Sequence, residues 1–222
     1  MSLKDIIKSQ TFFSSLNDAE LDKLVSISVI HHYEKDYILY YEHINTNELL
    51  FLIDGLAKAY KIDKHNNETF LYYIYADSMI SEVSDIDSER LSSFSNMQLI
   101  DDSRVLSINY KKFKEYFLNK NIMCKDLTRE IIKRSLQLQS LVNREFIFDA
   151  VSKVSMMLHD DLKMFNKLKR HDISLMLHIQ PATLSRVLNR LKRNNIIDII
   201  HGKVEITDAI ALQNIYKDKT DD

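Results

Sequence analysis

The sequence predicts an α+β protein whose N-terminal half is mostly β and whose C-terminal half is mostly helical. Three observations support this prediction. Short apolar runs recur at roughly ten-residue spacing through the first hundred residues, an amphipathic helical pattern covers about residues 119–143, and two short helical patterns followed by a period-two stretch end the chain. Many closely spaced strands favour a sandwich or a jelly-roll barrel over a βαβ sheet.

The predicted β-barrel domain spans residues 1–108. It opens with a helix at 16–28, for which Asn17 and Asp18 are the capping candidates and Leu21 and Leu24 lie on one side. The predicted strands cover residues 38–41, 49–53, 56–62, 69–75 and 105–108. Polar turns such as Asp54-Gly55 separate them.

The region 109–143 is predicted to be a dimerisation helix. Its apolar stripe is interrupted at Ser135 and consists of Cys124, Leu127, Ile131, Leu138 and Val142. A heptad-like stripe needs an apolar partner, and the same helix of a second copy is one candidate, which makes the stripe a dimer seam. The alternative is a helix that packs only on its own barrel.

The domain 144–222 is predicted to be a winged helix-turn-helix. A helix at 146–165, with Phe148, Val154 and Leu158 among its core residues, precedes two shorter helices that are joined by about four residues around 178–181. Pro181 suits the first turn of the second helix, because the missing N–H of proline has no intrahelical partner there. Two β runs around His201-Gly202-Lys203 then predict a hairpin.

The second short helix has the composition of a helix that reads DNA. Leu184, Val187, Leu188 and Leu191 form its buried side, and the other side carries small polar groups followed by cations. From Lys163 to Lys203 nine Lys or Arg oppose Asp172 and Asp198, in a chain of net charge -2. The alternative is a solvated basic face. We predict contacts with double-stranded DNA from Gln180, Pro181, Thr183, Ser185, Arg186, Asn189, Arg190, His201 and Lys203.

Composition excludes several other classes. No apolar run is long enough to cross a membrane and no signal peptide opens the chain, so we expect a cytoplasmic protein without a membrane partner. The single cysteine, Cys124, excludes a disulfide within the chain and a four-cysteine iron-sulfur cluster held by one subunit. Cys124 is either a small apolar packing residue or a redox switch.

With these features together, the chain resembles the Crp/Fnr family of bacterial transcription regulators over nearly its whole length. The segments that carry the resemblance are LLFLIDGLAKAY at 49–60, INYKKFKEYF at 108–117, ATLSRVLNRLKRNNII at 182–197 and HGKVEITD at 201–208. The resemblance implies a cyclic-nucleotide-binding-like barrel and a homodimer on a palindromic promoter site. RNA polymerase is an implied partner if the protein is an activator.

The resemblance also assigns roles within the predicted DNA contacts. Arg186 matches a family arginine that binds a guanine in each half-site, and Thr183 and Ser185 match positions that contact phosphates and bases. His201 and Lys203 match backbone contacts of the wing. Ala182 departs from the pattern, since most relatives carry a glutamate there, and this leaves the preferred base at that position open.

The effector is not fixed by the resemblance. Glu82 matches the glutamate of the cyclic-nucleotide cassette, but the cassette arginine aligns near Ser93 and Arg90 lies three residues away. Glu82 and Arg90 are the candidate effector-pocket residues. We therefore expect a branch without iron-sulfur cysteines and with a degenerate cassette, in which a cyclic nucleotide is disfavoured. Haem is an alternative cofactor through His31, His32, His43 or His65, although each of these is also explained as an ordinary surface or strand residue.

The predicted function is therefore transcription regulation in response to redox or nitrosative stress or to another small effector, and the alternative is a cyclic-nucleotide-responsive regulator. An enzyme is not predicted. A metalloenzyme on a similar barrel needs converging histidines, whereas His31 and His32 are adjacent and point to opposite faces of a strand. We predict no catalytic residues and no metal site.

Overall fold

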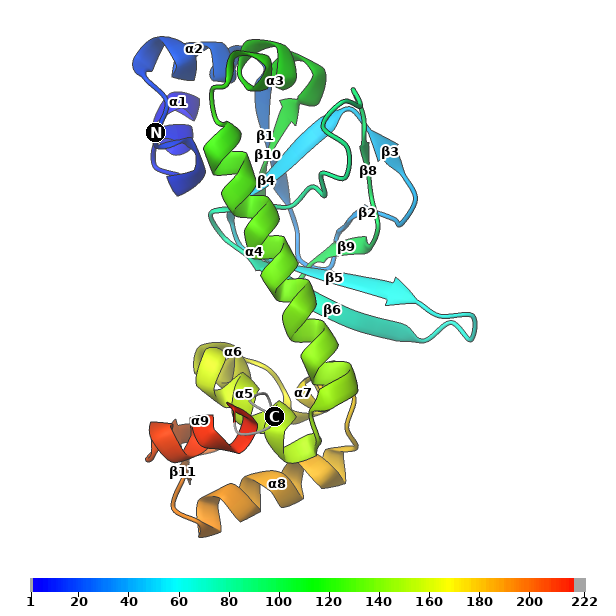
Figure 1. Ribbon diagram of the computed structural model, residues 1–222, viewed down its shortest axis with the longest axis vertical. Helices are drawn as coiled ribbons and strands as arrows, with labels where there is room; N and C mark the ends of the chain where they lie inside the picture. The colour runs from blue at the N-terminus through cyan, green and yellow to red at the C-terminus, as the bar shows by residue number, and fades with distance from the viewer. Residues whose placement is uncertain (1, 218–222) are drawn as a thin grey trace. The chain divides into compact units, whose positions relative to one another are not determined.

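The computed structural model describes residues 2–217 and divides into two compact units that meet between Gln137 and Leu138. This division falls inside the predicted linking region 109–143. The helices and strands are drawn in Figure 1. None of the helices in residues 2–217 is both long and apolar enough to span a membrane.

Short helices begin the N-terminal unit. They are α1 (Leu3–Lys8), a 3-10 turn (Thr11–Phe13) and α2 (Asp18–Ser26), and only α2 was predicted. Asn17 is the N-cap of α2: its side chain accepts a hydrogen bond from the backbone N–H of Glu20, whose carboxylate accepts one from the backbone N–H of Asn17. The predicted start at residue 16 is therefore wrong by two residues, and Asp18 lies inside the helix.

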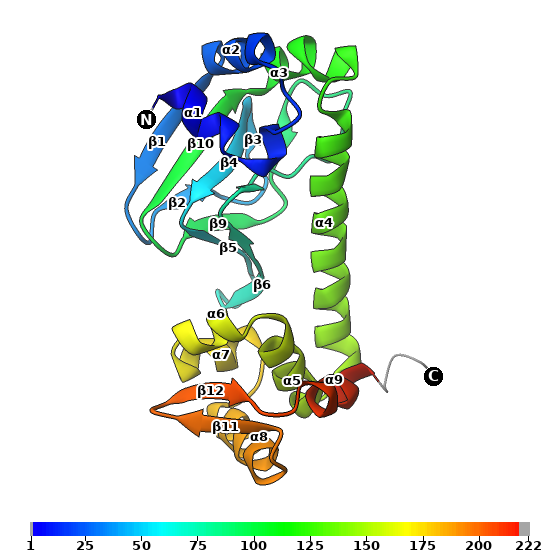
Figure 2. The same ribbon diagram turned by 90° about the vertical axis from the view of Figure 1, so that its left-hand side faces the viewer.

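The strands form two main sheets and a small pair that remain separate, in a jelly-roll-like arrangement. One sheet has the order β1 (Ser28–Tyr33), β10 (Ser103–Asn109), β4 (Glu48–Asp54) and β7 (Ser78–Met79) (Figure 2). The other has the order β2 (Ile38–Tyr40), β9 (Asn96–Leu99), β5 (Leu56–Ile62) and β6 (Glu68–Tyr75). The strands β3 (Asn45–Thr46) and β8 (Leu91–Ser92) pair with each other.

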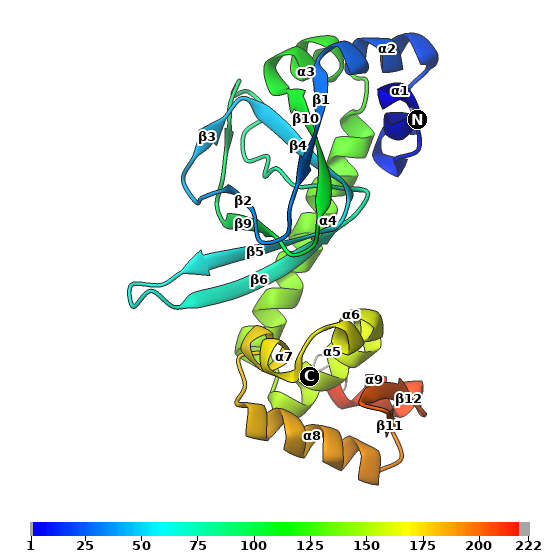
Figure 3. The same ribbon diagram turned by 180° about the vertical axis from the view of Figure 1, so that it is seen from behind.

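The strands β5 and β6 form a hairpin whose turn projects beyond the other strands of the N-terminal unit (Figure 3). At its start, Gly55 has φ +98, and a Cβ there would lie 2.0 Å from Oγ of Ser103. Only glycine fits at this position, because any side chain would meet both the backbone strain and the contact with β10.

Two apolar clusters hold the N-terminal unit together. The first joins the short helices to the β1-containing sheet and includes Phe13, Leu24, Phe51 and Ile108. The second contains residues of both main sheets, among them Leu52, Ala59, Met97 and Val105. The alternating burial of strands such as β6 follows from this arrangement, since one face of each strand points into a cluster.

The link to the C-terminal unit consists of α3 (Tyr110–Tyr116), a 3-10 turn (Leu118–Lys120) and α4 (Cys124–Val142). The predicted helix start at residue 119 is wrong. Asn121 and Met123 have φ values of 59° and 63°, which a right-handed helix cannot contain, so α4 begins only at Cys124.

In the C-terminal unit, the last residues of α4 are followed by a π-helical turn (Asn143–Ile147). The elements that follow are α5 (Ala150–Asp160), α6 (Leu162–Lys167), α7 (Arg170–Met176), α8 (Pro181–Arg193), β11 (Ile197–Ile200), β12 (Lys203–Ile206) and α9 (Ala209–Lys217). The predicted single helix at 146–165 is wrong, because Asp161 leaves the helical region at φ -149 and ψ 64 and caps α6 through a hydrogen bond from the N–H of Met164.

Candidate nucleic-acid interface

The predicted pair of short helices is present as α7 and α8, joined by residues 177–180. The backbone N–H of Leu177 donates to the carbonyl of Ile173, and that of Ile179 donates to the carbonyl of Ser174, which closes α7. His178, between them, has φ +51. Gln180 is the N-cap of α8 and Pro181 occupies its first turn, as the sequence predicted.

The helix α8 has one buried side and one exposed side. Leu184, Val187, Leu188 and Leu191 are buried in the C-terminal unit. The exposed predicted contacts on this helix are Pro181, Ser185, Arg186, Asn189 and Arg190, and Thr183 is half-buried. Ala182, which stands where the resemblance would place a glutamate, is also exposed. The helix therefore presents the predicted set of residues together on one surface.

The charges on this surface are available to a ligand. Within the described residues Arg186 and Arg190 have no salt bridge, whereas Lys192 is paired with Asp198 at 2.7 Å. The first turn of α8 contains no acidic residue. Its N–H groups and the arginines that follow form a positive surface, which suits the phosphates of a nucleic acid.

The predicted wing is the hairpin of β11 and β12, next to α8 in Figure 2. His201 and Gly202 form its tip with φ values of 50° and 81°, the left-handed pair of a tight two-residue hairpin turn. His201 and Lys203 are exposed. Both predicted wing contacts therefore lie at the tip, where no other described element covers them.

Two residues that fix the wing were missed by sequence analysis. The side chain of Asn166 donates to the carbonyl of Val204 at 2.9 Å and accepts from its N–H at 2.8 Å, as a strand partner would. The guanidinium of Arg170 donates to the carbonyl of Gly202 at 3.2 Å and lies 4.8 Å from the ring centre of Phe165. Burial lowers the pKa of Arg170. The hydrogen bonds from Asn166 and Arg170 to the wing join residues 38 and 32 positions apart, so no local pattern reveals them.

The residues of the predicted dimer seam differ in burial: those at the start of the stripe are buried or half-buried, and the later ones are exposed. Leu127 is 7% exposed and packs in the core of its own unit, and the Cys124 thiol is half-buried with Sγ 3.5 Å from the carbonyl oxygen of Leu118. Ile131, Leu138 and Val142 are exposed at 39%, 45% and 51%. The exposed part of the stripe therefore begins at Ile131.

A cavity of about 340 Å³ opens in the N-terminal unit, large enough for a small ligand. It is lined by hydroxyl groups, by apolar residues and by the carboxylates of Glu48 and Glu82. Glu82, one of the two candidate effector-pocket residues, therefore lines this cavity. Arg90 is an exposed residue and does not line the cavity, and among residues 2–217 no lysine or arginine does so.

Glu82 is held by groups of its own chain. Its carboxylate accepts hydrogen bonds from the Tyr72 hydroxyl at 2.9 Å, from the Ser95 hydroxyl at 3.0 Å and from the backbone N–H of Phe94. The Arg134 guanidinium lies 4.5 Å from the ring centre of Tyr72. Burial raises the pKa of Tyr72 to about 12, with Arg134 opposing the rise and Glu82 adding to it.

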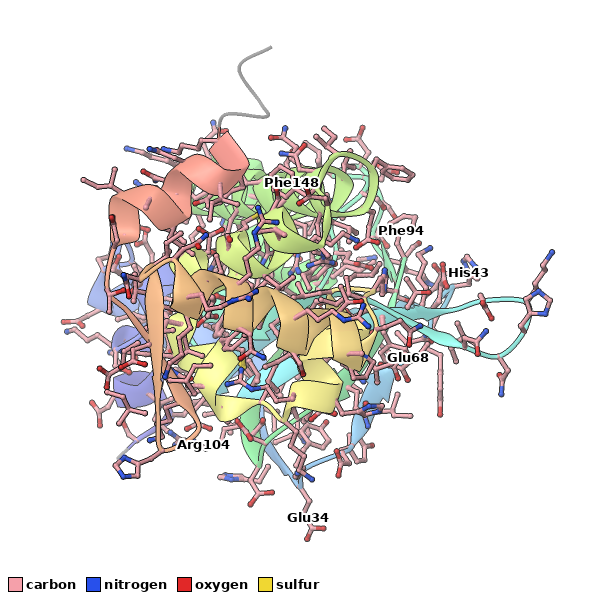
Figure 4. All side chains as sticks on the ribbon, turned by 90° about the horizontal axis from the view of Figure 1, so that it is seen from below. Glu34, His43, Glu68, Phe94, Arg104 and Phe148 are labelled. Atoms are coloured by element: carbon pink, nitrogen blue, oxygen red, sulfur yellow. The ribbon has the colours of Figure 1, made fainter. Side chains whose placement is uncertain are left out.

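The four histidines considered for haem do not converge. His31 lines the cavity, His32 lies on a separate surface depression, and His65 is an exposed residue of the β5–β6 turn. The side chain of His43 is 82% exposed and lies at the periphery of Figure 4. A haem in the cavity would find one protein imidazole, that of His31. Within residues 2–217, no three His, Cys, Asp or Glu side chains gather as metal ligands.

Comparison with known proteins agrees with this geometry. Residues 155–215 match the sequence model of the Crp-like helix-turn-helix domain, which covers α6, α7, α8 and the wing. No curated protein sequence matches the chain.

Similar solved structures extend the likeness to both units. The chain is similar to a CooA mutant from Carboxydothermus hydrogenoformans, with a TM-score of 0.72 and 16% identity over 98% of this chain and 96% of that one. A transcriptional regulator assigned to the crp/fnr family from Eubacterium rectale gives a TM-score of 0.66 at 16% identity, covering 93% and 98%. FixK2 from Bradyrhizobium japonicum gives 0.64 at 16% identity, covering 85% and 97%. At these identities the structures establish the fold.

Proposed function

We propose that this chain binds a palindromic DNA site as a homodimer, because residues 155–215 match the Crp-like helix-turn-helix domain and the whole chain has the fold of a Crp/Fnr transcription regulator. The observation that carries the proposal is the exposed face of α8. It presents Ser185, Arg186 and Arg190 beside a wing whose tip carries His201 and Lys203. We further propose that it acts in the cytoplasm, where it has access to such a DNA site.

Direct reading of bases is assigned to the first turns of α8. The fork of the Arg186 guanidinium matches the O6 and N7 acceptors of a guanine, and Asn189 and Arg190 lie one turn farther along the same face. The Ser185 hydroxyl donates to the carbonyl of Pro181 at 3.1 Å and still has lone pairs with which to accept from a base or to meet a phosphate through water. Selection of duplexes from a randomised pool tests the proposal: a recovered palindrome supports it, and recovery without any shared sequence contradicts it.

The dimer is assigned to the exposed part of the α4 stripe. Ile131, Leu138 and Val142 step by seven and four residues, so they share one side of the helix, and their exposure leaves them available to the same stripe of a second copy. Two copies would then bring two recognition helices to two half-sites, as a palindrome requires. RNA polymerase is the proposed partner if the protein activates transcription.

Lys203→Ala is expected to weaken binding to every duplex alike. The exposed ammonium lies at the wing tip, where it would neutralise a backbone phosphate and carry no base information. The slope of log affinity against log salt should fall by about one for each phosphate that the variant no longer neutralises. Titrations of the selected duplex and of a scrambled duplex at several salt concentrations measure this. A loss confined to one base-pair position would instead place the wing in a groove.

We propose that the cavity takes an effector other than a cyclic nucleotide. The carboxylates of Glu48 and Glu82 are the acidic groups on its lining, and a cyclic phosphate placed there would be repelled and would meet no guanidinium among the described lining residues. We propose that the protein responds instead to a redox or nitrosative signal. Absorption spectra after addition of haem, with and without nitric oxide, test it: a Soret band that shifts with nitric oxide supports the proposal, and free-haem spectra contradict it.

Calorimetric titration with cyclic AMP and cyclic GMP is expected to show no saturable heat. The control is the variant Glu82→Gln, which removes one carboxylate and keeps an acceptor for the Tyr72 hydroxyl. Saturable binding by the unmodified protein would favour the alternative, a cyclic-nucleotide-responsive regulator.

A further inference from the structure

We infer that Glu145 and His178 form a latch that positions the recognition helix α8 for specific DNA. Nδ1 of His178 lies 2.6 Å from Oε2 of Glu145, the distance of a charge-assisted hydrogen bond between residues 33 positions apart. The inference rests on the proposed function, since it concerns how α8 is held when it reads a site. Both residues belong to the C-terminal unit.

His178 is at the point where the chain changes direction between the two helices. Its backbone N–H donates to the carbonyl of Leu175 at 3.1 Å, and its φ of +51° is a left-handed conformation that is unfavourable for a residue with a Cβ. Pro181 begins α8 only three residues later. A contact that holds the ring of His178 therefore acts directly on the turn that sets the direction of α8.

Glu145 approaches this turn from the π-helical segment that follows α4. Its other oxygen, Oε1, accepts a hydrogen bond from Nε of Arg144 at 3.0 Å, which fixes the carboxylate. Single π-helical turns are frequent at functional sites, because the extra residue in the turn redirects side chains. The segment follows α4 directly in sequence, and through the contact of Glu145 with His178 it is tied to the turn before α8.

A second side chain holds the neighbouring turn residue. The ammonium of Lys153, on α5, donates to the carbonyl of Leu177 at 3.2 Å and lies 3.8 Å from Oε2 of Glu145. The carbonyl of residue 177 and the ring of residue 178 are therefore held by two charged groups that also contact each other. No part of this arrangement lies within the recognition helix.

The charged groups of this arrangement are largely buried and neutralise one another. Arg144 and Lys153 are each 8% exposed, and the Glu145 side chain is 20% exposed, so the carboxylate offsets cations that water reaches poorly. Burial alone would raise the pKa of Glu145, but the hydrogen bonds from His178 and Arg144 and the charges of His178 and Lys153 lower it. These contacts therefore favour the ionised carboxylate, which is the form that accepts a hydrogen bond from His178.

A double-mutant cycle on the full-length protein tests the latch. His178→Asn keeps a residue type that tolerates the left-handed conformation, and Glu145→Gln keeps the shape of the side chain. The probe is a duplex that the unmodified protein selects from a randomised pool, with a scrambled duplex of the same composition for non-specific affinity. His159→Asn is the matched control, because His159 pairs with Asp160 at 2.9 Å and is equally exposed, on α5 rather than in the turn.

Each single substitution is expected to lower affinity for the selected duplex about threefold to a hundredfold, and the double variant should be no weaker than the weaker single variant. Affinity for the scrambled duplex should stay unchanged, which separates loss of positioning from loss of folded protein. The control should bind as the unmodified protein does. Unchanged specific affinity, losses that multiply, or equal losses on both duplexes would each overturn the latch. If the unmodified protein selects no sequence, the proposed function fails and the latch fails with it.

Discussion

Replacing Arg186 with alanine is expected to remove most of the sequence preference of the protein. The side chain is exposed on the second turn of α8 and has no salt bridge among the described residues, so its guanidinium is available to a guanine. Loss of a bidentate guanine contact costs about 1–3 kcal/mol in each half-site, and a dimer loses it twice. Competition between the selected duplex and duplexes altered at single positions measures the loss.

The matched control for Arg186→Ala is Arg193→Ala. Arg193 is an exposed arginine at the last turn of the same helix, where it would meet phosphate and not bases. It should weaken selected and scrambled duplexes equally. If Arg186→Ala keeps the same preferred sequence at unchanged affinity, α8 is not the recognition helix.

Ile131→Glu is expected to dissociate the proposed dimer. The side chain is 39% exposed on α4, so the isolated protomer accommodates a carboxylate, but at a two-fold seam two buried like charges would face each other. A monomer loses the gain of binding two half-sites together, a factor of roughly 10²–10⁴ in affinity. Sedimentation velocity gives the oligomeric state, and titration of the selected duplex gives the affinity.

The control is Ile86→Glu, at an apolar residue of the same unit that is 65% exposed and lies outside α4. It makes the same change of charge and size and should leave the protein dimeric and active. If the Ile131→Glu variant is dimeric and binds DNA with normal affinity, the dimer seam does not lie on this stripe.

The parts of the fold that sequence analysis predicted are those with a regular local pattern. The buried side of α8, the Pro181 start and the His201-Gly202 turn are each determined by neighbouring residues, and all three are present. The strand β1 was missed because His31 and His32 interrupt its apolar alternation, and it is held instead by its pairing with β10. The break at Asp161 was missed because the apolar pattern continues through it.

The candidate site shows the same limit. The exposed face of α8 follows from helical periodicity, so its residues could be chosen from sequence. Arg170, Asn166 and Glu145 act on partners more than thirty residues away, and neither spacing nor composition identifies such pairs. Leu127 shows the opposite error, since its place in the heptad predicts a seam whereas it is buried in the first apolar cluster of its own unit.

The position of Cys124 makes the protein well suited to spectroscopic distance measurement. It is the only cysteine in the sequence and stands, half-buried, at the first residue of α4. A thiol-specific spin label would therefore mark each protomer once without any background substitution. In a homodimer the two labels report a single distance between symmetry-related helix ends, and any change in that distance on addition of an effector or DNA would reveal a rearrangement there.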